Sequence, residues 1–301
     1  MYQDIQKVGD AVKRTLAFFD IFNYSLTAFE IWKYLHAPGS GEVDFTTILN
    51  ELKNPELEKK IDLAQAFYFL KNKSDNVDLR KERYLIADAK LRKAKKFAAY
   101  LSRLPGVRGV AVSNTLAMFN SEEGADIDLF IIGERNKIWS TRFWSLLPLQ
   151  IFAKRPKPGR TRDKFCLSFF VDEDNLNLLP WKNQQDIYYV YWLATLLPIY
   201  DRGIFSDFWK QNKWLWEYLP NFAPARPSAR LAVAPSWRLP LPAPERAMKK
   251  FQLKIMPQEL KDSAGRAGTD VVIGDDVLKF HAQDRRDEFQ REFEQKVEAL
   301  F

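Results

Sequence analysis

Apolar residues recur at every third or fourth position through the N-terminal third of the chain, a spacing that predicts amphipathic helices. The first helix is expected within residues 1–22, where the pattern breaks at Asn23. A second, short helix should follow Thr27, because Glu30 lies three residues further on and completes the pattern of a capping box. A third short helix is expected over Thr46–Leu52.

An aromatic run over Ala64–Leu70, followed by the turn-rich Lys71–Asn76, has the pattern of a β-hairpin. With the three short helices, this hairpin predicts a winged-helix-like domain, to which a long helix over about 77–104 is attached. Eleven Lys and Arg against four Asp and Glu lie between Lys71 and Arg103. Such a basic face is typical of a solvated helix, and nucleic-acid contact is the alternative.

After residue 105 the pattern changes to short apolar runs, which predict strands. The expected strands are Val107–Val112, Ile127–Ile132 and Phe165–Val171. A helix over about 138–152 and a basic loop over 154–164 separate the second strand from the third. This order predicts a small mixed α/β (α+β) sheet, on which helices over about 184–199 and 206–219 pack.

The chain is expected to divide into four parts. The winged-helix-like domain and its long helix occupy residues 1–104, and the domain that carries the sheet occupies 105–220. A Pro-rich linker over 221–247 leads to a helical tail over 248–301.

Composition narrows the classes of protein to which the chain can belong. With 301 residues, 46% of them hydrophobic, it is long enough for two domains with cores of their own. A net charge of +7 favours polyanionic partners such as nucleoside triphosphates or nucleic acid. The single cysteine, Cys166, excludes an intramolecular disulfide, the N-terminus lacks a signal-peptide pattern, and the apolar run 187–200 is too short to cross a bilayer. We therefore expect a cytoplasmic protein without stable membrane insertion.

Two acidic residues stand at the start of the second predicted strand. Side chains at positions i and i+2 of a strand share a face, so Asp126 and Asp128 are expected to point the same way. Two carboxylates this close repel each other unless they share a cation, and such oxygen ligands suit Mg²⁺ or Mn²⁺ with bound phosphates. The pair therefore predicts a metal site for phosphoryl or nucleotidyl transfer.

A polar turn precedes this pair. Asn114 and Thr115 end the first predicted strand and open a short helical stretch. The free backbone N–H groups at such a helix start are able to bind a triphosphate. Asn114 and Thr115 are therefore candidate nucleotide-binding residues.

The turn and the Asp-x-Asp strand resemble the nucleotidyltransferase domain of the polymerase β superfamily, whose signature is Gly-Ser, a spacer, and Asp-x-Asp between apolar residues. More narrowly, the chain resembles bacterial nucleotidyltransferase-domain proteins of unassigned function. The segments that carry this second resemblance are Arg14–Thr27, Leu116–Met118, Trp139-x-x-Arg142 and Phe280-His281-x-x-Asp284. The resemblance implies transfer of a nucleoside monophosphate from a nucleoside triphosphate to a protein, nucleic-acid or small-molecule acceptor, with metal on Asp126 and Asp128.

Two departures from the family pattern leave alternatives open. Asn114 replaces glycine, although Asn tolerates a positive φ better than most residues, and Thr115 keeps the hydroxyl. The third carboxylate that such enzymes place on a neighbouring strand is missing from Phe165–Val171, and Asp172 at its end is the nearest candidate. Without a third acid the domain would be a catalytically degenerate nucleotide-sensing or nucleic-acid-binding regulator. A protein-interaction scaffold is a third alternative.

Other reactive residue types are expected to have structural roles. His36 and His281, the only histidines, lie far apart in sequence and do not suggest a catalytic pair. Cys166 lies inside an apolar strand and is expected to be a small buried hydrophobe. Trp139 and Arg142 are expected to contribute packing and a surface charge, respectively.

Overall fold

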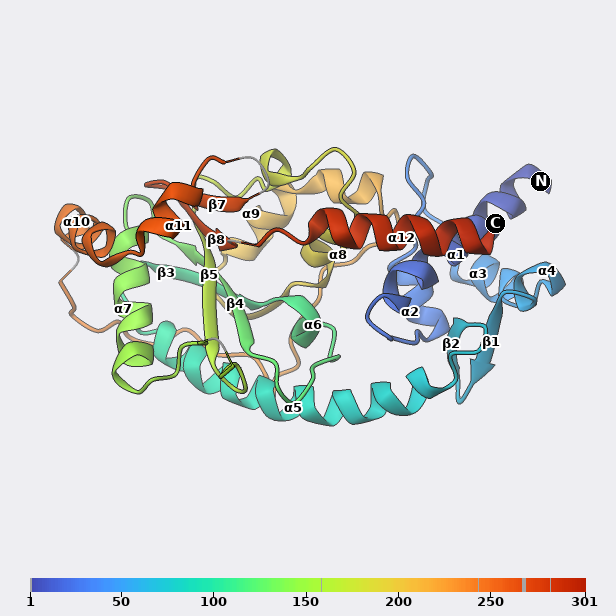
Figure 1. Ribbon diagram of the computed structural model, residues 1–301, viewed down its shortest axis with the longest axis horizontal. Helices are drawn as coiled ribbons and strands as arrows, with labels where there is room; N and C mark the ends of the chain where they lie inside the picture. The colour runs from blue at the N-terminus through green and yellow to red at the C-terminus, as the bar shows by residue number, and fades with distance from the viewer. Residues whose placement is uncertain (1, 158, 243, 267–268, 282) are drawn as a thin grey trace.

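A six-stranded mixed sheet forms the centre of the larger of two lobes (Figure 1). The structure, a computed structural model, describes residues 2–157, 159–242, 244–266, 269–281 and 283–301. The strand order is β6-β3-β4-β5-β8-β7, and only the central pair β4 and β5 is parallel. The bounds are β3 Val107–Val112, β4 Ile127–Gly133, β5 Phe165–Asp172, β6 Leu197–Asp201, β7 Asp270–Ile273 and β8 Val277–His281. The mixed α/β class and the three predicted strands are thereby confirmed.

Helices cover both faces of this sheet, because successive strand residues point to opposite sides. Val110 and Val112 face the cluster that includes the long helix α5 (Asp75–Leu101) and α7 (Ile138–Ile151). Ala111 faces the other cluster, with α8 and α9. The bounds of these two helices are Ile187–Thr195 and Ile204–Gln211.

Among the described residues, the smaller lobe consists of four helices and a hairpin. Its elements are α1 Tyr2–Asp20, α2 Ala28–Lys33, α3 Phe45–Glu51, α4 Pro55–Glu58, β1 Ile61–Ala64 and β2 Phe67–Leu70. The capping box is confirmed, since Thr27 accepts from the Glu30 backbone N–H and the Glu30 carboxylate accepts from the Thr27 N–H.

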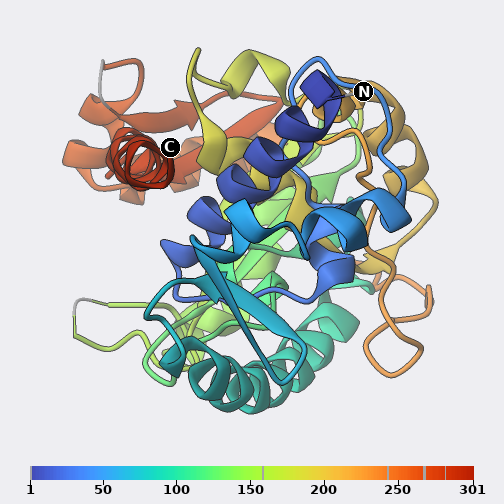
Figure 2. The same cartoon turned by 90° about the vertical axis from the view of Figure 1, so that its right-hand side faces the viewer.

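Two long helices connect the lobes on opposite sides of the molecule (Figure 1). The helix α5 runs along one side, and α12 (Arg286–Leu300) runs along the other to reach α1. Figure 2 shows α12 almost end-on, well separated from α5. A 2.7 Å ion pair between Lys296 and Asp20 fastens α12 to the end of α1. The space between the lobes is therefore bounded by elements from distant parts of the sequence.

The helix expected over 184–199 is shorter than predicted. It ends at Thr195, and β6 follows and pairs with β3. Pro198 explains the change, because the residue before a proline avoids helical geometry and an edge strand tolerates the missing N–H. The second expected helix is likewise divided, into α9 and a 3₁₀ helix over Lys213–Glu217.

The C-terminal part contributes strands as well as helices. Besides α12 it contains α10 (Glu245–Ile255) and α11 (Gln258–Ser263), and it extends the central sheet, since β8 pairs with β5 and β7 pairs with β8. The segment before α10, expected as a linker, lies along the larger lobe. The Val233 N–H donates to the Ile199 carbonyl at 2.8 Å. No helix in the described ranges combines the length and apolar character needed to cross a membrane.

Candidate functional site

The two predicted acidic side chains converge at the start of the parallel strand pair. Asp128 lies directly across from Cys166 of β5, and Asp126 lies just before β4. A carboxylate oxygen of each acid and the thiol sulfur lie within 4.8 Å of one another. The expected common orientation of Asp126 and Asp128 is therefore confirmed.

The polar turn after β3 is fixed against this pair. Its Ser113 N–H donates to the Asp128 carbonyl at 3.1 Å. Asn114 has a φ of 58°, in the left-handed region that Gly adopts freely and that Asn tolerates better than most residues. Its side chain hydrogen-bonds Asp128 and accepts a 3.3 Å hydrogen bond from the Tyr188 hydroxyl. Asn114 thus allows the left-handed turn to form, and its side chain links Asp128 with Tyr188 across the site.

Burial and mutual repulsion disfavour simultaneous ionisation of Asp126 and Asp128. Burial raises the pKa of Asp126, while its own backbone and Lys90 act in the opposite direction. Burial and the nearby Asp126 charge raise the pKa of Asp128 to about 7, despite hydrogen bonds from Asn114 and Cys166. Within the described residues, neither carboxylate forms an ion pair. A bound cation would relieve this repulsion.

The donor set fits a hard divalent cation better than a soft one. Burial, followed by the charges of Asp128 and Asp126, raises the pKa of the Cys166 thiol, so this sulfur stays neutral. Asp126 and Asp128 then offer oxygen ligands alone. Mg²⁺ is commonly held by one or two carboxylates together with substrate phosphates and water, which matches this arrangement.

A cavity of about 410 Å³ brings together four of the five predicted site residues: Asn114, Thr115, Asp126 and Asp128. It lies between the lobes and is also lined by the end of α1 and by α12. Arg83 of α5 and Arg285, just before α12, supply cations to its wall. The Arg83 side chain is 13% exposed and donates to the Phe22 carbonyl at 2.9 Å.

Sequence reasoning missed a lysine that holds the loop before β4. Lys90 of α5 is 2% exposed, and its ammonium donates to the carbonyls of Glu123 and Ala125 and pairs with Asp163 at 3.5 Å. The sequence does contain a signal for this role, because Lys90 lies among the apolar residues of α5, two turns beyond Arg83.

Asp172, the fifth predicted site residue, is not part of this group. It lies at the opposite end of β5, across from Gly133, whereas Asp128 lies across from Cys166. The Asp172 carboxylate instead accepts hydrogen bonds from the Asp174 N–H and the Asn175 amide. Asp172 lies six positions beyond Cys166 along the strand, roughly 20 Å at about 3.3 Å per residue. It is therefore too distant to bind the same metal.

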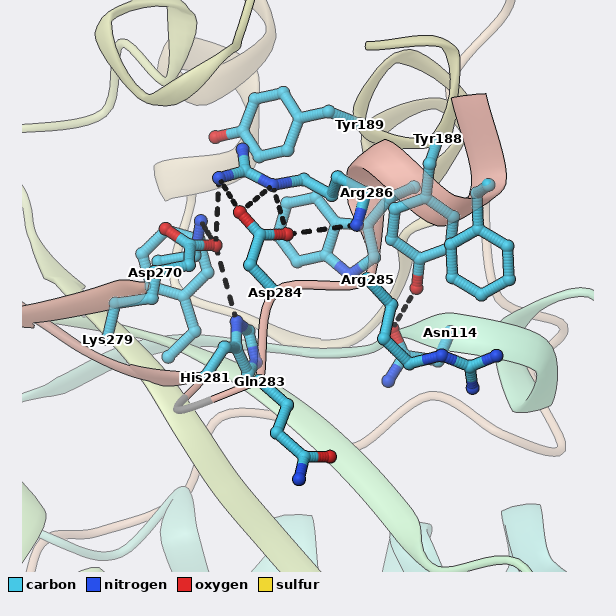
Figure 3. A pocket seen from close by; sticks show the side chains of 13 residues that line it. Asn114, Tyr188, Tyr189, Asp270, Lys279, His281, Gln283, Asp284, Arg285 and Arg286 are labelled. Carbon is cyan, nitrogen blue, oxygen red and sulfur yellow. Dashed lines mark hydrogen bonds and ion pairs between the residues drawn. The ribbon is translucent and has the colours of Figure 1, made fainter. Parts of the chain in front are cut away.

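A second cavity, of about 240 Å³, adjoins the first and shares Asn114, Tyr188, Arg285 and Phe289 with it (Figure 3). Asp270 lies in its wall between the side chains of Lys279, His281 and Arg286 (Figure 3).

His281 connects this second cavity with β5, the strand that pairs with the acidic strand β4. Its Nε2 lies 2.9 Å from the Ser168 hydroxyl, and its Nδ1 lies 3.7 Å from the Asp270 carboxylate. Ser168 in turn hydrogen-bonds Cys166, which hydrogen-bonds Asp128. His281 was expected to be structural, and no sequence spacing indicates this contact with Ser168.

Most of the basic face of α5 is occupied by intramolecular contacts. Arg80 pairs with Glu30 at 2.7 Å, and Lys93 pairs with Asp163 at 2.5 Å. Lys95 donates to the Arg230 carbonyl. These contacts favour the interpretation that the basic positions are structural.

Trp139 and Arg142 lie away from both cavities, on α7. Trp139 is fully buried, as packing requires. Arg142 was expected to be a surface charge but is only 8% exposed, because α10 packs over it.

Comparisons with known protein families, with curated proteins and with solved structures find no match to this chain. The support for a function therefore comes from the geometry of the site.

Proposed function

We propose that the protein transfers a nucleoside monophosphate from a nucleoside triphosphate to an acceptor hydroxyl, in a reaction that depends on Mg²⁺ or Mn²⁺. One observation carries this proposal. Two carboxylates that form no ion pair with any described residue face the same cavity as the Asn114–Thr115 turn. Paired acids facing a polar turn are what binding of a metal–triphosphate complex requires.

The residues of the first cavity have distinct roles in this proposal. Asp126 and Asp128 hold the cation, which when bound supplies positive charge to the triphosphate and to the departing pyrophosphate. The Thr115 hydroxyl and the turn around Asn114 contact the phosphates. Arg83, which pairs with Glu122 through NH2 and whose Nε has no partner among the described residues, adds positive charge beside the same anion.

The second cavity is where we place the acceptor. A lone pair of the acceptor oxygen forms a bond to the α-phosphorus, and the bond from that phosphorus to the pyrophosphate oxygen breaks. The acceptor proton passes to Nε2 of His281, through the Ser168 hydroxyl or directly, and Asp270 stabilises the resulting imidazolium. His281 would thus take the role for which Asp172 lies too far away.

The finer fold assignments belong to the same proposal. A nucleotidyltransferase fold is supported by the pairing of β3, which the Asn114–Thr115 turn follows, with β4, which carries Asp128. A winged-helix unit is supported by the order of α1, α2, α3 and the β1–β2 hairpin.

The rival function is a regulator that senses nucleotide or binds nucleic acid through the winged helix. The helix α3, which would be expected to enter a groove, has the sequence FTTILNE and contains no Lys or Arg. Phosphate contacts normally supply most of the affinity for nucleic acid, so this composition argues against nucleic-acid binding through α3.

The test is formation of labelled product and pyrophosphate from each of the four α-labelled triphosphates with Mg²⁺, with water, added alcohols and the protein itself as acceptors. We expect Asp128→Asn to lose at least about 100-fold in rate, and His281→Asn to lose roughly 10²–10⁴-fold while still binding nucleotide. The matched control is Asp172→Asn, expected to stay within about twofold. Equal losses in Asp172→Asn and Asp128→Asn would contradict the assignment, and nucleotide binding without any transfer would favour the regulator.

A further inference from the structure

A groove between α7 and the α10–α11 segment lies at the end of the larger lobe that faces away from α1 (Figure 1). Its volume is about 430 Å³, and its walls are mainly apolar. The apolar side chains that line it include Phe143, Leu146, Leu147, Phe251, Ile255 and Met256. This groove shares no lining residue with either cavity described above.

Two guanidinium groups line the same groove. Arg142 is 8% exposed, its NH1 donates to the Gln252 amide oxygen at 2.6 Å, and its guanidinium lies 4.6 Å from the centre of the Phe280 ring. Its Nε has no hydrogen-bond partner among the described residues, and no described carboxylate pairs with it. Burial lowers the pKa of Arg142. Arg155, in the basic loop after α7, is near enough to lower it further.

A buried guanidinium without a counter-ion is costly, because the lost hydration is not replaced by a nearby negative charge. A second cation nearby increases this cost. Both costs are relieved when an anion binds between Arg142 and Arg155. The apolar walls require that the remainder of such a ligand be hydrophobic.

We propose that this groove binds a long-chain fatty acid, with the carboxylate on Arg142 and Arg155 and the acyl chain along the apolar walls. The polar lining besides these arginines is limited to Gln150 and Gln252. The amide of Gln252 is already used, since its nitrogen donates to the carbonyls of Trp139 and Met248. A bound peptide would leave its own backbone N–H and C=O groups without partners, whereas an acyl chain has none to satisfy.

The experiment is calorimetric titration of the full chain with palmitate, with hexadecanol and butyrate as ligands that lack the charge or the chain. We expect palmitate to bind at least tenfold more tightly than either, and to raise the melting temperature. Arg142→Met and the exposed Arg155→Gln should each weaken palmitate binding at least tenfold. Lys250→Met, an exposed cation on α10 outside the groove, is the matched control and should not change it.

Arg155→Gln keeps the test decisive if Arg142→Met fails to fold, because Arg155 is exposed and lies in a loop. Equal palmitate affinity in the wild type and Arg155→Gln would overturn the proposal. So would equal affinity for palmitate and hexadecanol, or binding of phosphatidylglycerol vesicles or an acidic apolar peptide in the absence of palmitate binding.

Discussion

Asn114 illustrates how much a single residue of the site reveals before the fold is known. It stands where the superfamily that the sequence resembles has glycine, and its φ of 58° shows that the turn adopts the left-handed conformation. The common face of Asp126 and Asp128 was also predictable, because it follows from the alternation of side chains along one strand. The exclusion of Asp172 was not predictable, since it depends on the register between β4 and β5.

Lys90 leads to a prediction at this scale. Replacing it by Met removes the ammonium that holds the carbonyls of Glu123 and Ala125 and leaves these oxygens without a donor. We expect Lys90→Met to lower the free energy of unfolding by about 1–3 kcal/mol and to weaken Mg²⁺-dependent nucleotide binding, because the loop carries Asp126. Urea denaturation and nucleotide titration measure the two effects.

The control is Lys96→Met, an exposed position on the same helix, which should change neither quantity. If Lys90→Met matches this control in both measurements, Lys90 does not position the Asp126 loop.

At the scale of secondary-structure elements, long periodic segments were predictable, whereas the strands β6 and β7 were not. The long helix and the strands β3, β4 and β5 follow from apolar periodicity. The strand β6 was missed because its apolar run continues that of α8, and periodicity alone does not separate a buried helix from a buried strand. The strand β7 was missed because Asp270–Ile273 is only four residues long.

Gly109 of β3 leads to a prediction about the packing of α9 on the sheet. A Cβ at this position would lie 2.8 Å from Ile204 and 2.9 Å from Phe205. Gly109→Val should therefore lower the free energy of unfolding by about 1–3 kcal/mol through overpacking. Gly41→Ala is the control, because its Cβ would meet no atom within 4 Å. Equal stabilities of the two variants in urea denaturation would show that α9 does not pack closely here.

At the scale of the whole molecule, the cavity exists because α5 and α12 connect the two lobes around it (Figure 1). Its walls include Phe22 from the turn after α1, Arg83 from α5 and Phe289 from α12. The sequence predicted each of these helices but not their convergence, because contacts between residues so far apart leave no local periodic pattern. The roles of Arg83 and Tyr188 were missed for this reason.

His36 provides a prediction about how the lobes stay together. Its ring lies 6.4 Å from that of Tyr191 in α8 and 6.0 Å from that of Phe293 in α12. Burial, with a smaller effect of Arg14, lowers its pKa from 6.5 to about 4. The fold therefore favours the neutral ring, so this stabilisation is complete above about pH 6.5 and is lost as the pH falls towards 4.

We expect the free energy of unfolding of the wild type to fall, through His36, by on the order of 2 kcal/mol between pH 7 and 4.5. His36→Phe should lack this component, and urea denaturation at the two pH values measures the difference. An identical fall in both proteins would show that His36 does not titrate between these pH values.

The central claim is that the first cavity binds a metal–nucleotide complex through Asp126 and Asp128. Calorimetric titration with α,β-methylene analogues of the four triphosphates, which cannot release pyrophosphate, tests it without requiring an acceptor. With Mg²⁺ present, we expect saturable binding of at least one analogue to the wild type and to Asp172→Asn. Binding should weaken at least about 100-fold in the Asp126→Asn/Asp128→Asn variant or without Mg²⁺. Equal affinity of the wild type and this double variant, or no binding to the wild type, would contradict the claim.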